Sequence, residues 1–348
     1  MSECFKETPS CYKCKGTPQV NYKNKLVVCR PCFQTHICEK GFRSNLRNSL
    51  KIVGKENRIL VMFTGDQSSL MMCRLLADVL KDDSKEHKRM FIQPKVVVVD
   101  FGPLMSSVGM FNESVRFEQV MKGSLEFVQN LGLDTETIST SEFIGDDRVV
   151  KVFRGLDRRG DFLEDFLNIL QFNAMRFACR KFNVDRMLTP ETSEQLSARL
   201  FGLMCKGRVD EVGTQCLQVY ITRWQGKPIA VCRPLYERTN RDVGLFNYFN
   251  RTVDLDLRLI HSVVHPRPKI EERLPCQGSI NTLLTEFVSS MQHEYVSTST
   301  TVLKTLEKLV DPLSDLAGLP QCFLCHKEMT KATEETRTVC QGCRAYIK

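Results

Sequence analysis

The middle of the chain consists of apolar runs that alternate with stretches of helical periodicity. The continuous runs RILVMFT (58–64) and KVVVVDFG (95–102) are typical of strands buried on both faces of a sheet. Shorter runs predict further strands at 135–140 and 184–190. Apolar residues at helical spacing predict helices over 68–80, 113–132, 161–183 and 193–205. Strands that alternate with helices indicate a parallel sheet covered on both faces, so we expect an α/β fold.

Each end of the chain carries two C-x2-C pairs, and at both ends fourteen residues separate the pairs. The sulfurs of one pair can reach a single tetrahedral metal ion, and two pairs on one hairpin complete a Cys4 site. A reduced loop without metal is the alternative, but these segments have few apolar residues, and zinc binding contributes about 10–16 kcal/mol to folding. The sequence therefore predicts two structural zinc sites, with ligands Cys11, Cys14, Cys29, Cys32, Cys322, Cys325, Cys340 and Cys343.

The Pro-rich stretch HPRPKIEERLP (265–275) marks a boundary, after which helical periodicity returns over 280–295 and 301–310. We therefore expect four segments. A zinc ribbon with a basic helix occupies 1–50, an α/β domain 51–265, a helical segment 266–311 and a second zinc ribbon 312–348.

The composition argues against a membrane-spanning or secreted protein. The 348 residues include 16 cysteines and carry a formal charge of +8. No apolar run approaches the ~18 residues of a membrane span. The first residues lack the apolar core of a secretory signal. We therefore expect a cytoplasmic protein whose cysteines are reduced and available for metal.

Positive charge is concentrated in the first 50 residues, which hold nine Lys or Arg and three Asp or Glu. A Cys4 zinc site would itself carry about −2, so this excess is weak evidence for a polyanion partner when taken alone. Lys40, Arg43 and Arg47 recur at three and four residues and therefore share one face of a helix. This face either contacts the phosphates of an RNA or is merely solvated.

The segment TGDQSS (64–69) follows the first buried strand and precedes a helix, which is the arrangement of a phosphate-binding loop. Asp66 places a side chain and a negative charge where phosphates would lie. Two like charges ~4 Å apart repel by roughly 4 kcal/mol at an effective dielectric of 20. We expect a degenerate loop, with weak nucleotide binding as the alternative, formed by Thr64, Gly65, Asp66, Ser68 and Ser69.

Three internal segments, together with the terminal cysteines, resemble the PP-loop tRNA thiolation proteins. They are MFTGDQSSLMM, LTPETSEQLSARLFGLMCKGR and CRPLYERTNRDVGLFNYF. With STSTTVLKTLEKL near the C-terminus, the arrangement is most similar to the cytoplasmic tRNA 2-thiolation protein 2 family. The resemblance implies a PP-loop (adenine nucleotide alpha hydrolase-like) sheet flanked by N- and C-terminal zinc ribbons. It also implies a subunit of the cytoplasmic complex that 2-thiolates the wobble uridine, U34, of tRNA.

The partners that this resemblance implies are a catalytic PP-loop thiolase subunit, in a heterodimer, and tRNA. Sulfur would come from a thiocarboxylated ubiquitin-like carrier, whose direct contact with this chain stays open. The Lys40, Arg43 and Arg47 face would then contact the tRNA.

The chain departs from the catalytic branch of this resemblance at several positions. Asp66 replaces the second Gly of the family's loop and Ser68 replaces its Asp, while the sequence Thr-Pro-Glu (189–191) replaces a Gly-His-Asn motif. The catalytic branch has a mid-domain C-x2-C pair and a later third cysteine. In this chain the pair is missing, and only Cys276 could correspond to the third cysteine. One thiolate cannot hold an iron–sulfur cluster. ATP and an iron–sulfur cluster are therefore not expected, and a non-catalytic subunit is favoured.

Two other functions stay open at this point. One is an active ATP-dependent tRNA-modifying enzyme with an unusual loop, and the other is a plain zinc-ribbon nucleic-acid-binding protein. The single tryptophan, Trp224, is expected in an exposed hairpin or at an interface, with a platform for base stacking as the alternative.

Overall fold

The structure is a computed structural model. It describes residues 10–22, 26–52, 57–82, 92–145, 147–156, 161–252, 255, 257–260, 279–309, 319–329 and 338–347. The expected boundary at residue 265 and Cys276 lie outside these residues.

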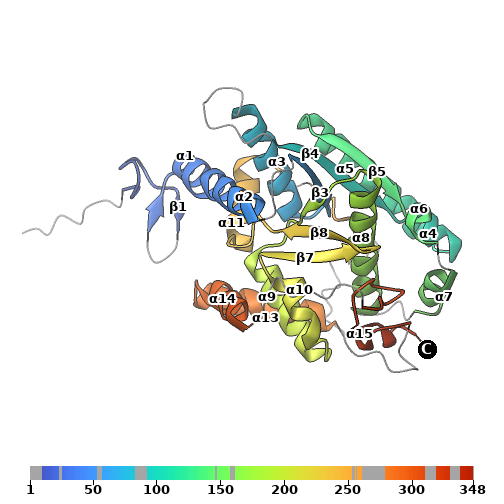
Figure 1. Cartoon of the computed structure of the whole chain (residues 1–348). Helices are drawn as coiled ribbons and strands as arrows, with labels where there is room; N and C mark the ends of the chain where they lie inside the picture. The colour runs from blue at the N-terminus through green and yellow to red at the C-terminus, as the bar shows by residue number, and fades with distance from the viewer. Residues whose placement is uncertain are drawn as a thin grey trace, which may run out of the picture.

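A six-stranded sheet forms the centre of the molecule, with strand order β5-β4-β3-β6-β8-β7 (Figure 1). Only β7 runs antiparallel to its neighbour. The apolar runs are buried because they lie in the middle strands, whose side chains contact helices on both faces. The expected α/β fold with a parallel sheet is confirmed. The strands are β3 (Arg58–Phe63), β4 (Gln93–Asp100), β5 (Asp134–Ser139), β6 (Arg186–Leu188), β7 (Val219–Trp224) and β8 (Lys227–Cys232).

Helices cover the sheet and extend below it. Helix α8 (Asp161–Lys181) packs against β3, β4, β6 and β7, while α3 (Gln67–Asp82) follows β3 and α5 (Phe111–Asn130) packs against β4 and β5. Four helices after β6 form a separate layer: α9 (Ser193–Cys205), α10 (Val212–Cys216), α13 (Ile280–Glu294) and α14 (Thr298–Leu309) (Figure 1). The remaining helices of the body are α4 (Gly102–Ser107), α6 (Thr140–Phe143), α7 (Asp147–Gly155), the 3-10 turn η3 (Val209–Glu211) and α11 (Asn240–Phe249).

None of the helices in the described part of the chain combines the length and the apolar character needed to cross a bilayer.

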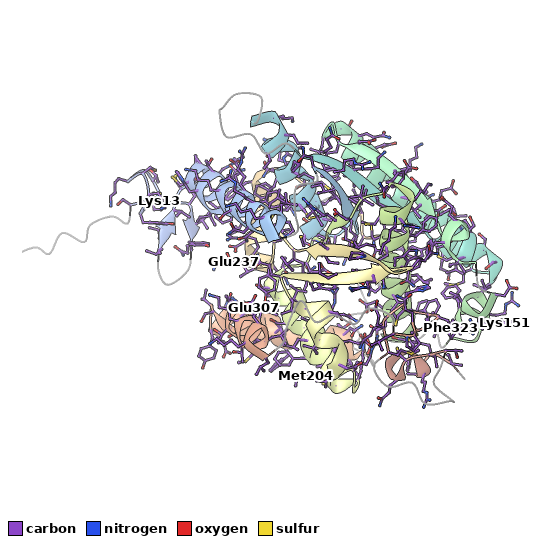
Figure 2. The ribbon with its side chains drawn as sticks, viewed as in Figure 1. Lys13, Lys151, Met204, Glu237, Glu307 and Phe323 are labelled. Carbon is purple, nitrogen blue, oxygen red and sulfur yellow. The ribbon has the colours of Figure 1, made fainter. Side chains whose placement is uncertain are left out.

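Two small cysteine-rich modules lie at different sides of the body (Figure 1). The N-terminal module contains a short hairpin of β1 (Val20–Asn21) and β2 (Val27–Val28), followed by α1 (Arg30–Cys32), the π-helical segment η2 (Phe33–Glu39) and α2 (Lys40–Ile52). The C-terminal module contains the bridge between Gln321 and Glu328, and α15 (Gln341–Arg344). Lys13 and Phe323 mark these two modules in Figure 2.

Candidate functional site: the loop after β3 and two Cys4 centres

The degenerate loop lies at the carboxyl end of β3, beside the carboxyl end of β6. From β3 the chain continues to β4 on one side, whereas β6 and β8 lie on the other. This is the point at which the strand order reverses, and ligands of open α/β sheets bind at such points. The position of the loop therefore matches that of a ligand site.

The Asp66 carboxylate folds back into its own loop. Its Oδ1 accepts hydrogen bonds from Thr64 Oγ1 at 2.7 Å and from the Ser69 N–H at 2.8 Å. Its Oδ2 accepts from Ser68 Oγ at 2.9 Å and from Gln195 Nε2 at 3.1 Å. Asp66 thus acts as the N-cap of α3, and its charge lies at the positive end of the helix dipole. The carboxylate occupies donors that an anion bound at this helix N-terminus would need.

A segment from a distant part of the chain covers the same loop. We call Leu255 and residues 257–260 the cover segment. The Leu259 N–H donates to Thr64 O at 3.1 Å, and Gln67 Nε2 donates to Leu255 O at 3.2 Å. Gly65 has a φ of +75°, and a Cβ at this position would lie 1.4 Å from Leu257 O. Only glycine fits there, because the backbone of the cover segment rests directly on the loop.

A buried charge cluster lies behind the loop, at the end of β6. The Glu191 carboxylate pairs with Arg199 Nη1 at 2.7 Å and with Arg233 Nε at 3.3 Å. Burial by itself raises the pKa of Glu191, but the two guanidinium groups outweigh it and hold this pKa at about 2. Arg233 also donates to the carbonyl oxygens of Leu217 and Gln215. The cluster therefore ties the ends of β6 and β8 to α9 and α10.

The basic helix predicted for RNA contact is α2, and it docks beside the carboxyl end of β8. Asn45 Nδ2 donates to Pro234 O at 3.3 Å. Lys40 and Arg47 are exposed, whereas Arg43 is half-buried. The three side chains therefore differ in solvent exposure, although all of them lie on α2, beside the carboxyl end of β8.

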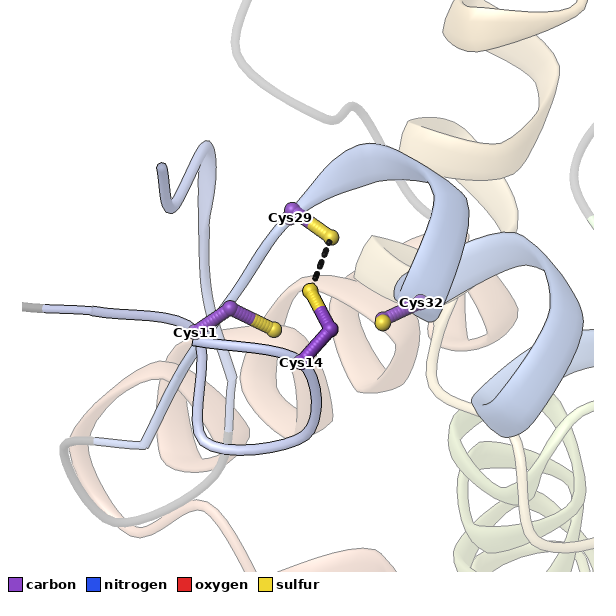
Figure 3. Close-up of side chains that lie close together, drawn as sticks. All are labelled: Cys11, Cys14, Cys29 and Cys32. Atoms are coloured by element: carbon purple, nitrogen blue, oxygen red, sulfur yellow. Dashed lines mark hydrogen bonds between the residues drawn. The ribbon is translucent and has the colours of Figure 1, made fainter. Parts of the chain in front are cut away.

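The four N-terminal cysteines are brought together, with all four sulfurs within 4.8 Å of one another (Figure 3). Cys14 Sγ and Cys29 Sγ are 3.5 Å apart. A tetrahedral ion with Zn–S bonds of about 2.3 Å needs sulfurs about 3.8 Å apart, so this donor set fits such an ion. The module contacts the body through α11, where Arg30 Nη2 donates to Phe249 O at 2.6 Å and Phe33 packs against the Phe249 ring.

The four C-terminal cysteines form a second group of the same size, in which Cys325 Sγ and Cys340 Sγ are 3.7 Å apart. Helix α8 holds this group against the body. Asn173 Nδ2 donates to Leu324 O at 2.7 Å, and the buried Arg176 donates through Nη2 to Cys325 O at 2.7 Å. Two further contacts fix its edges, because Arg148 lies 4.4 Å above the Phe323 ring and Arg208 donates to the Tyr346 hydroxyl.

Trp224 is buried in this interface, so its expected place in an exposed hairpin is wrong. It ends β7, is 5% exposed, and its ring centroid lies 4.2 Å from that of His326. The tryptophan does lie at an interface, but with the chain's own C-terminal module. No local pattern indicates this pairing, because the two residues are far apart in the sequence.

Sequence reasoning also missed Gln195, Leu257 and Arg176, which contact the loop or a cysteine group. Gln195 could have been found, since Thr192 and Gln195 form a T-x-x-Q capping box at the start of α9. Nothing near Leu257 or Arg176 in the sequence indicates a partner of either residue.

Comparison with known proteins gives a consistent result. Residues 279–345 match the family model described as cytoplasmic tRNA 2-thiolation protein 2. Proteins of that name are similar along most of the chain. The protein from Bos taurus is 22% identical, over 94% of this chain and 74% of its own length. Those from Dictyostelium discoideum and Homo sapiens are each 21% identical, over 91% and 90% of this chain and 58% and 71% of their own lengths.

A solved structure shares the fold. It is the U34-tRNA thiolase NcsA from Methanococcus maripaludis, determined with its [4Fe-4S] cluster. The TM-score is 0.65 at 13% identity, over 98% of this chain and 96% of that one. At this identity the likeness concerns the fold alone.

Proposed function

We propose that this chain, which is similar to the cytoplasmic tRNA 2-thiolation protein 2 family along most of its length, is a subunit of the cytoplasmic machinery for tRNA U34 2-thiolation. Family and fold both support a role in U34 thiolation. The finer part of the proposal is that the chain is not itself the catalyst. It supports a catalytic PP-loop thiolase subunit and helps to hold the tRNA, while sulfur arrives from a thiocarboxylated ubiquitin-like carrier through that subunit.

The main support for this proposal is that the loop after β3 is already filled by groups of the chain itself. Four donors that surround the ligand position already bind the Asp66 carboxylate, and the cover segment rests on Gly65. A nucleotide phosphate would have to displace both groups and would meet the negative charge of Asp66. A chain with its own carboxylate in this place is better suited to support a reaction than to activate tRNA with ATP.

We propose zinc as the metal of both Cys4 groups. Four thiolates without an open position are the donor set of structural zinc, and no step of catalysis is assigned to either group. The metal would fix short segments that have little apolar core, and the exposed cations Lys40 and Arg47 of α2 would contact tRNA phosphates.

Reconstitution tests the proposal. The full chain is co-expressed with the catalytic PP-loop thiolase subunit, and thiolation of tRNA is measured for each chain alone and for the complex, with ATP and a sulfur donor. We expect the two chains to co-purify, thiolation to need both, and ATP to leave the melting temperature of this chain unchanged.

Two results would contradict the proposal in different ways. Adenylation or thiolation of tRNA by this chain alone would make it an active enzyme. Binding of tRNA without any complex with the thiolase, and without an effect on thiolation, would make it a plain nucleic-acid-binding protein.

A further inference from the structure

Helix α13 carries an apolar stripe on the side that faces solvent. Ile280, Leu283 and Phe287 are 41%, 60% and 50% exposed, and their spacing of three and four residues places them on one face of the helix. The opposite face, with Val288 and Gln292, is buried against the body. A surface helix ordinarily has polar residues on its outer face, so this stripe is unusual for a protein that acts alone.

Helix α9 continues the stripe without a gap. The rings of Phe201 and Phe287 meet edge to face with centroids 6.2 Å apart. Cys205 is exposed one turn further along α9, on the same side as Phe201. The two helices approach closely, because a Cβ at Gly202 would lie 3.7 Å from the side chains of Asn281 and Leu284. We call Phe201, Cys205, Ile280, Leu283 and Phe287 the α9–α13 face.

The α9–α13 face is held in place by hydrogen bonds at the start of α13. Asp161 accepts from Ser279 Oγ at 2.7 Å and from the Ile280 N–H at 2.8 Å. Lys206, at the end of α9, pairs with Asp165 at 2.6 Å and donates to Asn281 Oδ1 at 2.8 Å. A rigid face loses little conformational entropy when a partner binds, which favours its use in recognition.

The charges around this face select the kind of partner. Helix α13 contains no Lys or Arg, and Glu294 is exposed on it. Arg199 of α9 is paired with Glu191, and Lys206, which follows α9, is paired with Asp165. The exposed cations nearby, Lys304 and Lys308, lie on the neighbouring helix α14, so an RNA backbone would find no cation on α13 itself. A second copy of the chain would place glutamates against glutamates, because a two-fold contact brings the same patch together from both sides.

We propose that the α9–α13 face is the docking surface for the catalytic thiolase subunit, which binds it with an amphipathic helix. The partner helix has an apolar stripe that covers Leu283 and Phe287, and a Lys or Arg beside the stripe that meets Glu294. This inference rests on the proposed function, since it names the surface through which the supporting subunit would contact the catalytic one. The α13 part of the face, though not Phe201 and Cys205, lies in the residues that match the family model.

Two variants of the full chain, Leu283→Glu and Phe287→Glu, test the surface in co-expression with the catalytic subunit. Both positions are exposed, so the fold should persist, and an unchanged melting temperature checks this. Val115→Glu is the matched control, because Val115 is a 57% exposed aliphatic residue on α5. We expect each variant to weaken the complex at least 100-fold, with a matching loss of thiolation at limiting concentration, and the control to behave like the wild type. Glu294→Lys should weaken the complex in a salt-dependent way.

Failure of this inference and failure of the proposed function give different results. If the wild type and all variants bind the catalytic subunit equally, the surface lies elsewhere and the proposed function stands. If the wild type forms no complex at all, both are overturned. A dimer of the wild-type chain alone that Leu283→Glu converts to a monomer would show that a second copy covers the face. Loss of tRNA binding with the complex intact would assign the face to RNA.

Discussion

At the scale of single residues, the Asp66 carboxylate accepts hydrogen bonds from one backbone and three side-chain groups. Each of these donors lies where the end of a strand meets the start of a helix, which is the favoured position for binding an anion. Here the Asp66 carboxylate itself takes the place of a bound anion. Its effect on stability and its effect on ligand binding should therefore have opposite signs.

Replacement of Asp66 separates these two effects. Glycine is itself tolerated at an N-cap, so the main cost of Asp66→Gly is the lost acceptor of the Ser69 N–H and of Gln195 Nε2, and we expect a loss of about 1–3 kcal/mol in the free energy of unfolding. The same change frees the loop donors, so phosphate or ATP should raise the melting temperature of the variant but not that of the wild type. Ligand at a hundred times its dissociation constant would stabilise by ~2.7 kcal/mol, which thermal denaturation detects readily.

Asp66→Asn is the control for charge, because asparagine is also a good N-cap. A wild-type chain that ATP stabilises as strongly as the glycine variant would contradict the view that the carboxylate closes the loop.

Glu191 illustrates a second residue whose role is structural. Removal of its charge in Glu191→Gln leaves Arg233, whose side chain is 1% exposed, without its counter-ion, and we expect a loss of about 3–5 kcal/mol at pH 7. Its pKa of about 2 lies below the ordinary 4.5, so the stabilisation is present above pH 4.5 and is lost as the pH falls towards 2. Urea denaturation of both proteins across this range should show the difference shrinking.

Glu136→Gln is the matched control, because Glu136 pairs with Lys95 at 3.7 Å on the surface and should contribute under about 1 kcal/mol. Equal losses for the two variants would mean that the Glu191 cluster is no stronger than a surface pair.

At the scale of elements, the contacts that matter most join segments far apart in the sequence. Apolar runs predicted β3 and β4 because buried parallel strands need continuous apolar residues, and the loop after β3 was located by the strand and helix around it. The cover segment escaped prediction because its contact with Gly65 uses backbone atoms, which leave no trace in side-chain pattern. The cysteine spacings predicted both clusters, but not the dependence of the C-terminal one on α8.

Arg176 is the residue through which α8 supports the C-terminal cysteines. It donates to Cys325 O, and its positive charge is buried beside thiolates that would carry about −2 with zinc bound. Partners of this kind are worth about 10–100-fold in metal affinity. We expect Arg176→Met to lose the C-terminal ion first in a titration with chelator, so that metal analysis falls from about two ions per chain to about one.

Arg180→Met provides the comparison, since Arg180 is exposed on the same helix. Retention of both ions by Arg176→Met, at the chelator concentration that spares the Arg180 variant, would rule out this supporting role. Near-zero metal in the folded wild type would reject the zinc sites altogether.

At the scale of the whole molecule, the N-terminal module, which includes α2, extends the body on the side where the carboxyl end of β8 lies, while the C-terminal module is fixed against α7 and α8 (Figure 1). The α9–α13 face belongs to a third region, near Met204 at the lower edge of Figure 2. Surfaces for RNA and for a protein partner would therefore be separate, which allows both to be bound at once. The division into four domains stays a prediction.

This separation makes the RNA surface testable on its own. Replacing Lys40, Arg43 and Arg47 together by Gln should weaken tRNA binding and reduce the slope of log K against log salt by roughly 0.7–0.9 for each tRNA phosphate that the helix no longer binds. Since Arg43 is half-buried, we expect the two exposed residues to account for most of the change.

The matched control replaces three exposed lysines elsewhere, Lys227, Lys304 and Lys308, and alters total charge equally. Binding is measured by titration at several salt concentrations, with the thiolase complex intact in both proteins. Equal effects of the two triple variants would show that only overall charge matters, whereas a change of slope confined to the α2 variant would place tRNA phosphates at this helix.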